Sequence, residues 1–466
     1  MADQATTLTG NPSAQFDIAA DLTSRLIDLV RDIDFAALPS DVQRHARHSL
    51  TDTLGVQALG SVTEPVHMLR RVVLNPLPEG ATVIGPEPLR TDPLTAAMIN
   101  GLAGHIRDFD DAGAGGHVSA IIVPVTLALA EVREASGADV LSAMVSGYET
   151  AFRINRLLTQ THYYLGFHSS GTVGTFGAAA AACRILGLPS EQWAMAFGIA
   201  GSLASGLIAN FGSMTKPLHT ANAARAGILA ARLAQEGFTG SAQILEHKLG
   251  FVRTHTMDSD AAAALAPLGQ PWALSSMMYK FNAACTGTHS GGDGTRRLLR
   301  EHSLTADDVA AMTLRVPKIQ TEVANIQWPQ TVEQAKFSIR FVAAAALLGI
   351  NTAEAFPEQD SQIADPAVQS AIGRIEVLPL DGVNHGGRTD IEMRLTNGQT
   401  ISGSFDSSIP MTDLDAEQAK IADKFRHTAA ALWGAAAVDS ALDRLLAFER
   451  EPSVRAFLAD LTDAGA

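Results

Sequence analysis

The chain has 466 residues, of which 46% are apolar and 18% charged, and its formal net charge is −15. This length favours two domains, and the apolar share supports a large core and excludes a disordered protein. The negative charge argues against nucleic acid as a partner, because nucleic-acid binding requires a basic surface. An acidic protein that binds an anion needs a local cationic site, so histidines and the few lysines are the candidate binding residues.

The number of cysteines and the first residues of the chain indicate the cellular compartment. Cys183 and Cys285 are the only cysteines, which is too few for a disulfide framework, so a cytoplasmic protein is expected. Residues 1–16 lack the basic and apolar regions of a signal peptide and are interpreted as a disordered leader. No apolar run reaches the roughly 18 residues that a membrane span needs, so no membrane contact is expected.

The first half of the chain has mostly helical patterns. Apolar residues recur at helical spacing over residues 17–60, and a second helix is expected to start near Ser40. Residues 81–85 predict a short strand or an extended loop. Residues 94–265 are interpreted as helical almost throughout, with glycine-containing stops at 187–189 and 237–240.

Alternating patterns replace the helical ones after Pro267. Residues 308–319 and 372–380 alternate as strands do, and residues 388–406 hold two alternating runs joined by Asn397-Gly398, a strong hairpin signal. An apolar helix is expected over 338–349, between these strands, and residues 415–461 are helical again.

These patterns predict a mainly α protein with an α+β second domain. A large helical domain would be built from both chain ends, residues 17–267 and 407–466. A smaller α+β domain, residues 268–406, would be inserted between them.

The first candidate site is the segment from His105 to His117. It holds three aspartates, at 108, 110 and 111, followed by a glycine-rich loop that ends on the histidine. Buried carboxylates are costly unless they are paired or used. Metal ligation by oxygen, a flexible active-site wall and a solvated helix end all fit this pattern.

The second candidate lies at residues 166–177, where glycines recur every third position. This spacing differs from the dinucleotide fingerprint and no strand precedes it, so close helix packing is an alternative to ligand binding. A helix that begins near Ser169 would direct free N–H groups at an anion, with His168 beside them. A packing role for His168 is equally compatible with the sequence.

Two further segments carry isolated charged or titratable residues. Lys216 is the first lysine of the chain and stands among Gly, Ser, Thr and Ala. Its ammonium could hold a substrate carboxylate or move a proton, or it could be an ordinary exposed lysine. His289 closes the segment that starts at Lys280, near the expected domain boundary, where ligand sites are common.

The chain resembles the MmgE/PrpD family in three segments that keep the family's order and spacing: GFHSSGTVGTFGAAAAACRILGL, GSLASGLIANFGSMTKPLHTANAARAG and GFTG. Members of this family include 2-methylcitrate dehydratases, cis-aconitate decarboxylases and iminodisuccinate epimerases. The resemblance implies a helical domain with a smaller α+β domain and an active site in the cleft between them. It also implies a homodimer, a small di- or polycarboxylate substrate, and no metal or organic cofactor.

The resemblance also implies which residues form the site. The family's motif positions correspond to Asp108, His117, His168, Lys216 and His289. Lys216 and one histidine could act as opposed proton-transfer groups, and Asp108 could orient a histidine. Tyr148 is a weaker candidate for a proton carrier.

Three departures from the family pattern bear on the reaction. Dehydratase-like and decarboxylase-like members usually carry a threonine where this chain has Ala112, and the loop to His117 is one residue shorter with Val118 in place of a proline. The missing hydroxyl favours proton abstraction and return, so an iminodisuccinate epimerase or racemase is the first expectation. A methylcitrate-like dehydratase or cis-aconitate-like decarboxylase is the alternative, and a non-catalytic polycarboxylate-binding protein is another.

Overall fold

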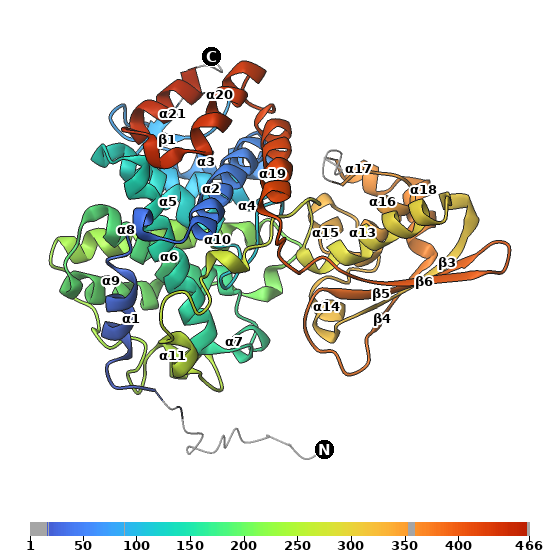
Figure 1. Cartoon of the computed structure of the whole chain (residues 1–466), viewed down its shortest axis with the longest axis horizontal. Coiled ribbons are helices and arrows are strands. Elements are labelled where there is room, and N and C mark those ends of the chain that lie inside the picture. The colour runs from blue at the N-terminus through green and yellow to red at the C-terminus, as the bar shows by residue number, and fades with distance from the viewer. Residues whose placement is uncertain (1–15, 17, 88, 353–358, 464–466) are drawn as a thin grey trace.

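A computed structural model of the chain describes residues 16, 18–87, 89–352 and 359–463 (Figure 1). The leader expected over residues 1–16 lies outside the described residues except for Phe16. Phe16 packs against the helical core, with the guanidinium of Arg253 4.9 Å from its ring centroid.

A large helical part contains both ends of the described chain, and the smaller part with the main sheet lies beside it (Figure 1). The expected fold class, mainly α with an α+β second domain, is confirmed. The helices of the large part are α1 Leu22–Val30, α2 Ser40–Ser61, α3 Glu64–Val73, α4 Pro93–His105, α5 Ser119–Arg133, α6 Gly137–Leu158, α7 Thr161–Tyr164, α8 Ser169–Leu186, α9 Ser190–Leu203, α10 Thr215–Gln235, α11 Phe251–His255, α12 Ala261–Ala264, α19 Leu414–Ala429, α20 Ala435–Leu445 and α21 Val454–Asp463.

A two-stranded sheet is added to these helices. The strands β1 (Ala81–Val83) and β2 (Leu89–Thr91) pair antiparallel, which confirms the short strand expected at 81–85. The C-terminal helices return to the N-terminal ones, because α19 packs along α2. No helix in the described part of the chain is long and apolar enough to cross a membrane.

Small residues allow the central helices to approach closely. The helix α8 packs against α5, α6 and α10, and residues 178–182 of its alanine run are fully buried. A Cβ atom on Gly177 would lie 2.8 Å from the carbonyl oxygen of Gly147, and one on Gly171 would lie 2.2 Å from that of Ser205. The packing role considered for the glycines of residues 166–177 is therefore present, and it fixes the position of the N-terminus of α8.

The smaller part is a four-stranded mixed sheet in the order β4-β3-β5-β6. The strands β3 and β4 are parallel, the other neighbours are antiparallel, and Gly398 takes a φ of +88° in the β5–β6 turn. The hairpin expected at Asn397-Gly398 is thus confirmed. Helices α13 and α16 pack together beside the sheet. The elements are α13 Thr286–Glu301, β3 Val309–Val316, α14 Lys318–Val323, α15 Val332–Ala335, α16 Ile339–Leu347, α17 Asp360–Ile363, α18 Pro366–Gly373, β4 Ile375–Pro379, β5 Arg388–Leu395 and β6 Thr400–Asp406.

The helical stretch expected over 94–265 is interrupted more often than the sequence pattern indicates. Residues 106–118 and 204–214 leave the α-helical conformation, and glycines with positive φ stand at 113, 115, 116, 206 and 212. These two interruptions lie near each other at the start of α8, where the His168 N–H donates to the Gly206 carbonyl at 3.0 Å. They supply much of the candidate site.

Candidate active site

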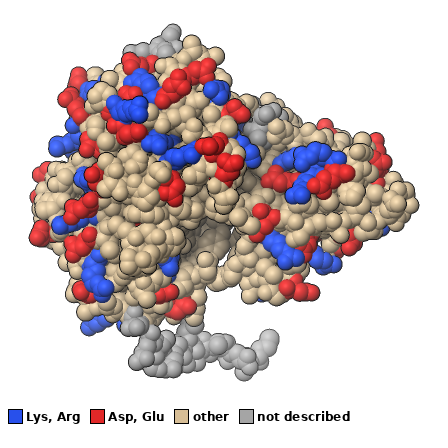
Figure 2. Space-filling model, in the orientation of Figure 1, with Lys and Arg blue, Asp and Glu red and all other residues tan. Residues whose placement is uncertain are grey.

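A cavity of about 390 Å³ lies where the helical part meets the smaller part. The molecular surface is visibly hollowed between the two parts, and on this face Lys and Arg are interspersed with Asp and Glu (Figure 2). The helical part contributes His117, Tyr163, His168, Ser170 and Lys216 to the cavity wall, and the smaller part and its connection contribute Cys285, Gln320 and His385.

The start of α8 forms one wall of this cavity. His168 is the N-cap residue but makes no side-chain cap bond, and its ring Nδ1 lies 3.0 Å from Nδ1 of His219. Ser169 and Ser170, the first two residues of the helix, also line the cavity. A helix N-terminus favours an anion through its free N–H groups and its dipole. Because α8 begins at Ser169, the helix start that the sequence predicted there is confirmed.

A buried carboxylate pairs with two lysines behind this wall. The Lys216 Nζ donates to Asp108 Oδ2 at 2.5 Å, and the Lys280 Nζ contacts Oδ1 of the same side chain. Lys280 also donates to the Asp108 backbone carbonyl at 3.0 Å. The three side chains are only 2–4% exposed. Lys216 is thus held at the cavity by an ion pair that water hardly screens.

Electrostatics keep Asp108 ionised. Burial alone would raise the pKa of its carboxyl, but the charges of Lys216 and Lys280 outweigh burial and hold that pKa well below the usual range. For Lys280, burial lowers the ammonium pKa, while the nearby Asp108 charge outweighs this and raises it. The backbone at Asp108 has a φ of +50°, an uncommon conformation for a residue other than glycine.

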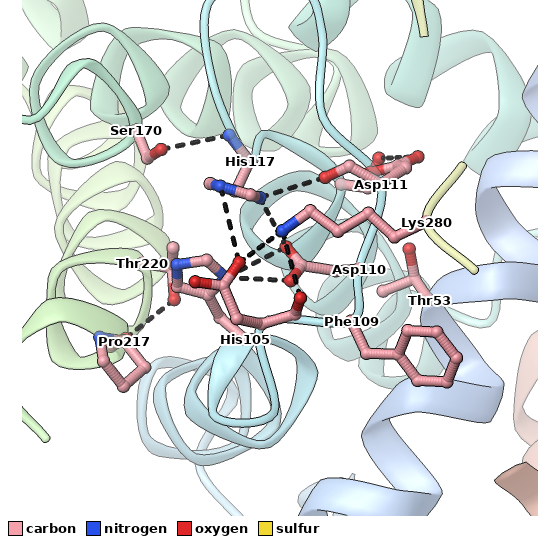
Figure 3. A network of polar contacts seen from close by, with 12 residues as sticks. Thr53, His105, Phe109, Asp110, Asp111, His117, Ser170, Pro217, Thr220 and Lys280 are labelled. Atoms are coloured by element: carbon pink, nitrogen blue, oxygen red, sulfur yellow. Dashed lines mark hydrogen bonds and ion pairs between the residues drawn. The ribbon is translucent and has the colours of Figure 1, made fainter. Parts of the chain in front are cut away.

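A second carboxylate holds two histidines in place. Asp110 lies 2.9 Å from His105 Nδ1 and 3.2 Å from His117 Nδ1, and His117 Nδ1 is also 3.0 Å from the Asp111 carbonyl. Figure 3 shows His117, Asp110 and Lys280 pointing toward one another. The His117 Nε2 is 4.0 Å from Asp108 Oδ1, so the two carboxylates and both histidines form one network.

Burial favours the neutral form of three histidines at or behind the cavity wall, His105, His117 and His168. Burial lowers the pKa of His168 well below its usual range, and the charge of Lys216 acts in the same direction. Burial also lowers the pKa of His105 to about 3, against the opposing charge of Asp110. The pKa of His117 is lowered by burial and by the two lysines as well. Neutral imidazoles beside an ammonium group can accept a proton.

The structure brings together most, but not all, of the residues singled out in the sequence. His117, His168 and Lys216 line the cavity and Asp108 lies behind them. His289 instead lines a separate cavity of about 200 Å³, with its Nε2 3.0 Å from the Ala284 carbonyl.

Tyr148 also lies away from the cavity wall. It is fully buried, and its hydroxyl is 2.5 Å from that of Ser119. Burial and the charge of Asp111 raise its pKa well above the usual range. This environment is that of a packed, neutral phenol.

Lys280 was not assigned a role in the sequence analysis. It stands in the same segment as His289 and is one of only seven lysines, so the rarity that drew attention to Lys216 applied to it too. The contact between Tyr164 and His385, a residue of the cavity wall, was also missed. These residues are 221 positions apart, and no local pattern connects them.

Four side chains of this network could in principle hold a metal ion: His105, Asp108, Asp110 and His117 offer ligand atoms within 4.8 Å of one another. However, both oxygens of Asp108 already contact ammonium groups. A divalent cation there would lie beside two positive charges, so the arrangement fits an ion-pair network better than a cation site.

Comparison with known proteins identifies the family to which the chain belongs. The MmgE/PrpD N-terminal domain model matches residues 24–264, and the MmgE/PrpD C-terminal domain model matches residues 283–447. The chain is 30% identical over 429 residues to a human cis-aconitate decarboxylase, a match that covers 88% of each chain. It is 31% identical to the mouse cis-aconitate decarboxylase, over 76% of this chain and 75% of the relative.

A cis-aconitate decarboxylase of Aspergillus terreus is 25% identical over 67% of each chain. These relatives are decarboxylases, so the narrower expectation of an iminodisuccinate epimerase gains no support from them. Both family models together span most of the sequence, and the chain belongs to the MmgE/PrpD family.

Proposed function

We propose that this protein is a lyase that acts on a small polycarboxylate, with decarboxylation of a cis-aconitate-like substrate as the leading reaction. Dehydration of a methylcitrate-like substrate is the related alternative. The position of Lys216 carries the proposal: a buried ammonium lines the cavity beside neutral histidines and a helix N-terminus in a chain of net charge −15. The cis-aconitate decarboxylases to which the chain is about 30% identical add support.

The chemistry fits these groups. When a carboxylate leaves cis-aconitate as CO₂, its electron pair moves to the adjacent methylene carbon and shifts the double bond, and the far carbon takes up one proton. The substrate trianion plus one proton thus becomes an unsaturated C5 dicarboxylate and CO₂. Cations must hold the retained carboxylates, and a positioned acid must deliver the proton.

Lys216 and the N-terminus of α8 would hold retained carboxylates, since both present positive charge or N–H groups to the cavity. Asp108 would position the Lys216 ammonium through the 2.5 Å ion pair. His117 and His168 both line the cavity as neutral imidazoles and are the candidates for proton transfer: one of them would take up a proton from water and pass it to the far carbon of the substrate.

Epimerisation of iminodisuccinate or a related N-substituted aspartate is a second candidate, favoured by Ala112. The alanine methyl cannot donate the hydrogen bond of the usual threonine. Other hydroxyls line the cavity, however, among them Tyr163, Ser169 and Ser170. The loss of one hydroxyl at Ala112 is therefore weaker evidence against a lyase reaction than the sequence alone indicated.

Proton NMR in D₂O separates these reactions when cis-aconitate, 2-methylcitrate and iminodisuccinate are each incubated with the protein. New olefinic signals and CO₂ from cis-aconitate would support decarboxylation, and a new unsaturated tricarboxylate from 2-methylcitrate would support dehydration. Loss of the Cα–H signal of iminodisuccinate with an intact skeleton would instead establish the epimerase. Binding of all three without turnover would favour a non-catalytic binding protein.

A further inference from the structure

A second cluster of titratable side chains lies away from the candidate active site, where three parts of the chain meet. His45 and His48 stand one turn apart on α2, and Glu417 reaches them from α19, the first helix after the main sheet. Ligand atoms of the three lie within 4.8 Å of one another. All three residues are at most 6% exposed.

The hydrogen bonds of this cluster leave one buried polar atom without a partner. His48 Nδ1 lies 2.8 Å from Glu417 Oε1, within hydrogen-bonding distance. His45 Nδ1 lies 3.4 Å from the same oxygen but is buried without a hydrogen-bond partner. Buried polar atoms in folded proteins are nearly always paired, so a bound ion or water would explain this unpaired nitrogen.

The 3.4 Å separation matches the distance between two ligand atoms of a tetrahedral zinc ion. Bonds of roughly 2.0–2.1 Å to nitrogen and oxygen in a tetrahedron place neighbouring ligand atoms about 3.4 Å apart. The pair of His45 Nδ1 and Glu417 Oε1 stands at this distance, whereas His48 Nδ1 and Glu417 Oε1, which are 2.8 Å apart, would have to separate slightly on metal binding. Two imidazoles and one carboxylate are also a ligand set that suits first-row divalent metals.

The surroundings supply support for the ligands and access for an ion. The ring of Tyr279 packs edge-on against His48 at 6.1 Å, and its hydroxyl donates to the His45 carbonyl at 3.2 Å. Glu417 is one of the residues that line the cavity of about 200 Å³ that also contains His289. That space can hold water as a remaining ligand.

We propose that His45, His48 and Glu417 bind one divalent transition-metal ion, of which Zn²⁺ is the best fit. The ion joins α2 to α19, and Tyr279 from the connection between the two parts packs against His48. Its role is therefore to fix the junction at which the chain enters and leaves the smaller part. This site is separate from the lysine-paired network at Asp108.

Cobalt spectroscopy tests the proposal on the untagged, full-length protein after removal of metals with a chelator. Tetrahedral Co²⁺ gives intense visible bands, so titration should show bands that saturate at about one ion per chain and disappear when Zn²⁺ is added. Zn²⁺ should also raise the midpoint of thermal unfolding by several degrees, because it binds only the folded site.

His45→Gln is the most informative variant, because His45 Nδ1 makes no hydrogen bond to the protein and its loss should leave folding intact. Glu417→Gln removes the shared oxygen ligand and is the second variant. Both should lose the visible bands and the Zn²⁺-dependent thermal shift. His427→Gln, on the exposed side of α19, is the matched control and should retain both.

Three results would overturn the proposal. One is the absence of saturable Co²⁺ binding at micromolar concentrations. Another is the retention of the bands in His45→Gln and Glu417→Gln. The last is loss of the bands in His117→Gln with the cluster of His45, His48 and Glu417 intact, which would place the ion in the network at Asp110.

Discussion

Replacing Asp108 with asparagine tests the ion-pair network behind the cavity. At the 2.5 Å separation of Lys216 Nζ and Asp108 Oδ2, the attraction between unit charges is roughly 7 kcal/mol for an effective dielectric constant of 20. Desolvation of the charges offsets much of this attraction. Removing one partner of a buried pair still costs about 3–5 kcal/mol. Because Asp108→Asn removes the carboxylate that pairs with two buried ammonium groups, we expect a loss at the upper end of that range.

Urea denaturation followed by circular dichroism measures this loss. The control is Asp390→Asn, which removes an ion pair with Arg388 whose side chains are 29% and 52% exposed. Solvent screens that pair, so the control should lose less than about 1 kcal/mol. If Asp108→Asn were as stable as the control, the buried-pair argument would be refuted.

The same pair sets a pH dependence. The folded-state pKa of Asp108 is depressed, so its contribution to stability is fully present above the unfolded value of about 3.9 and is lost as pH falls. The stability difference between wild type and Asp108→Asn should stay constant between about pH 5 and 8 and shrink below about pH 4. A difference that grows on acidification would contradict the assignment.

Further variants test other parts of the account. Lys216→Met should lower kcat/KM by about 10²–10⁴-fold, whereas Lys318→Met at an exposed position should leave it unchanged; a fully active Lys216→Met protein would remove this lysine from the mechanism. Tyr148→Phe should lower activity by less than about tenfold and stability by about 1 kcal/mol, since its hydroxyl bonds a buried serine outside the cavity wall; a large kcat loss in a stable Tyr148→Phe protein would restore it as a catalytic residue. Gly227→Ala should destabilise by about 1–3 kcal/mol in a thermal melt, because the added Cβ would lie 2.3 Å from that of Ala178; an unchanged melting temperature would mean that α8 and α10 can separate freely.

Features that depend on neighbouring residues in sequence could be predicted. The Asn397-Gly398 turn, the helix start at Ser169 and the short strand at 81–85 each follow from local backbone preferences. The close packing around Gly177 follows from glycines three residues apart. These preferences act over a few residues, which is why the sequence pattern was sufficient.

The candidate site could be predicted only in part, because it depends on contacts between distant segments. Lys280 reaches Asp108 across 172 residues, and no spacing rule connects them. His289 was chosen from its place near a domain boundary and from the family resemblance, but in α13 its ring lies against the Ala284 carbonyl and lines another cavity. The helical pattern over 94–265 also concealed the interruption at 204–214 that forms part of the site.

Several expectations stay predictions. The homodimer is tested by the mass of the protein in solution, and the cytoplasmic location by fractionation of cells. The domain bounds at 267 and 406 are tested by limited proteolysis, which should cut near the two connections between the parts if they are separate domains.

We propose that the protein removes a carboxyl group from a cis-aconitate-like tricarboxylate in the cavity beside Lys216. The most direct measurement is release of labelled CO₂ from carboxyl-labelled cis-aconitate by the wild type, with Lys216→Met as the matched variant. We predict enzyme-dependent CO₂ release by the wild type that falls at least 100-fold in the variant. No release by the wild type, or equal release by both proteins, would contradict the account.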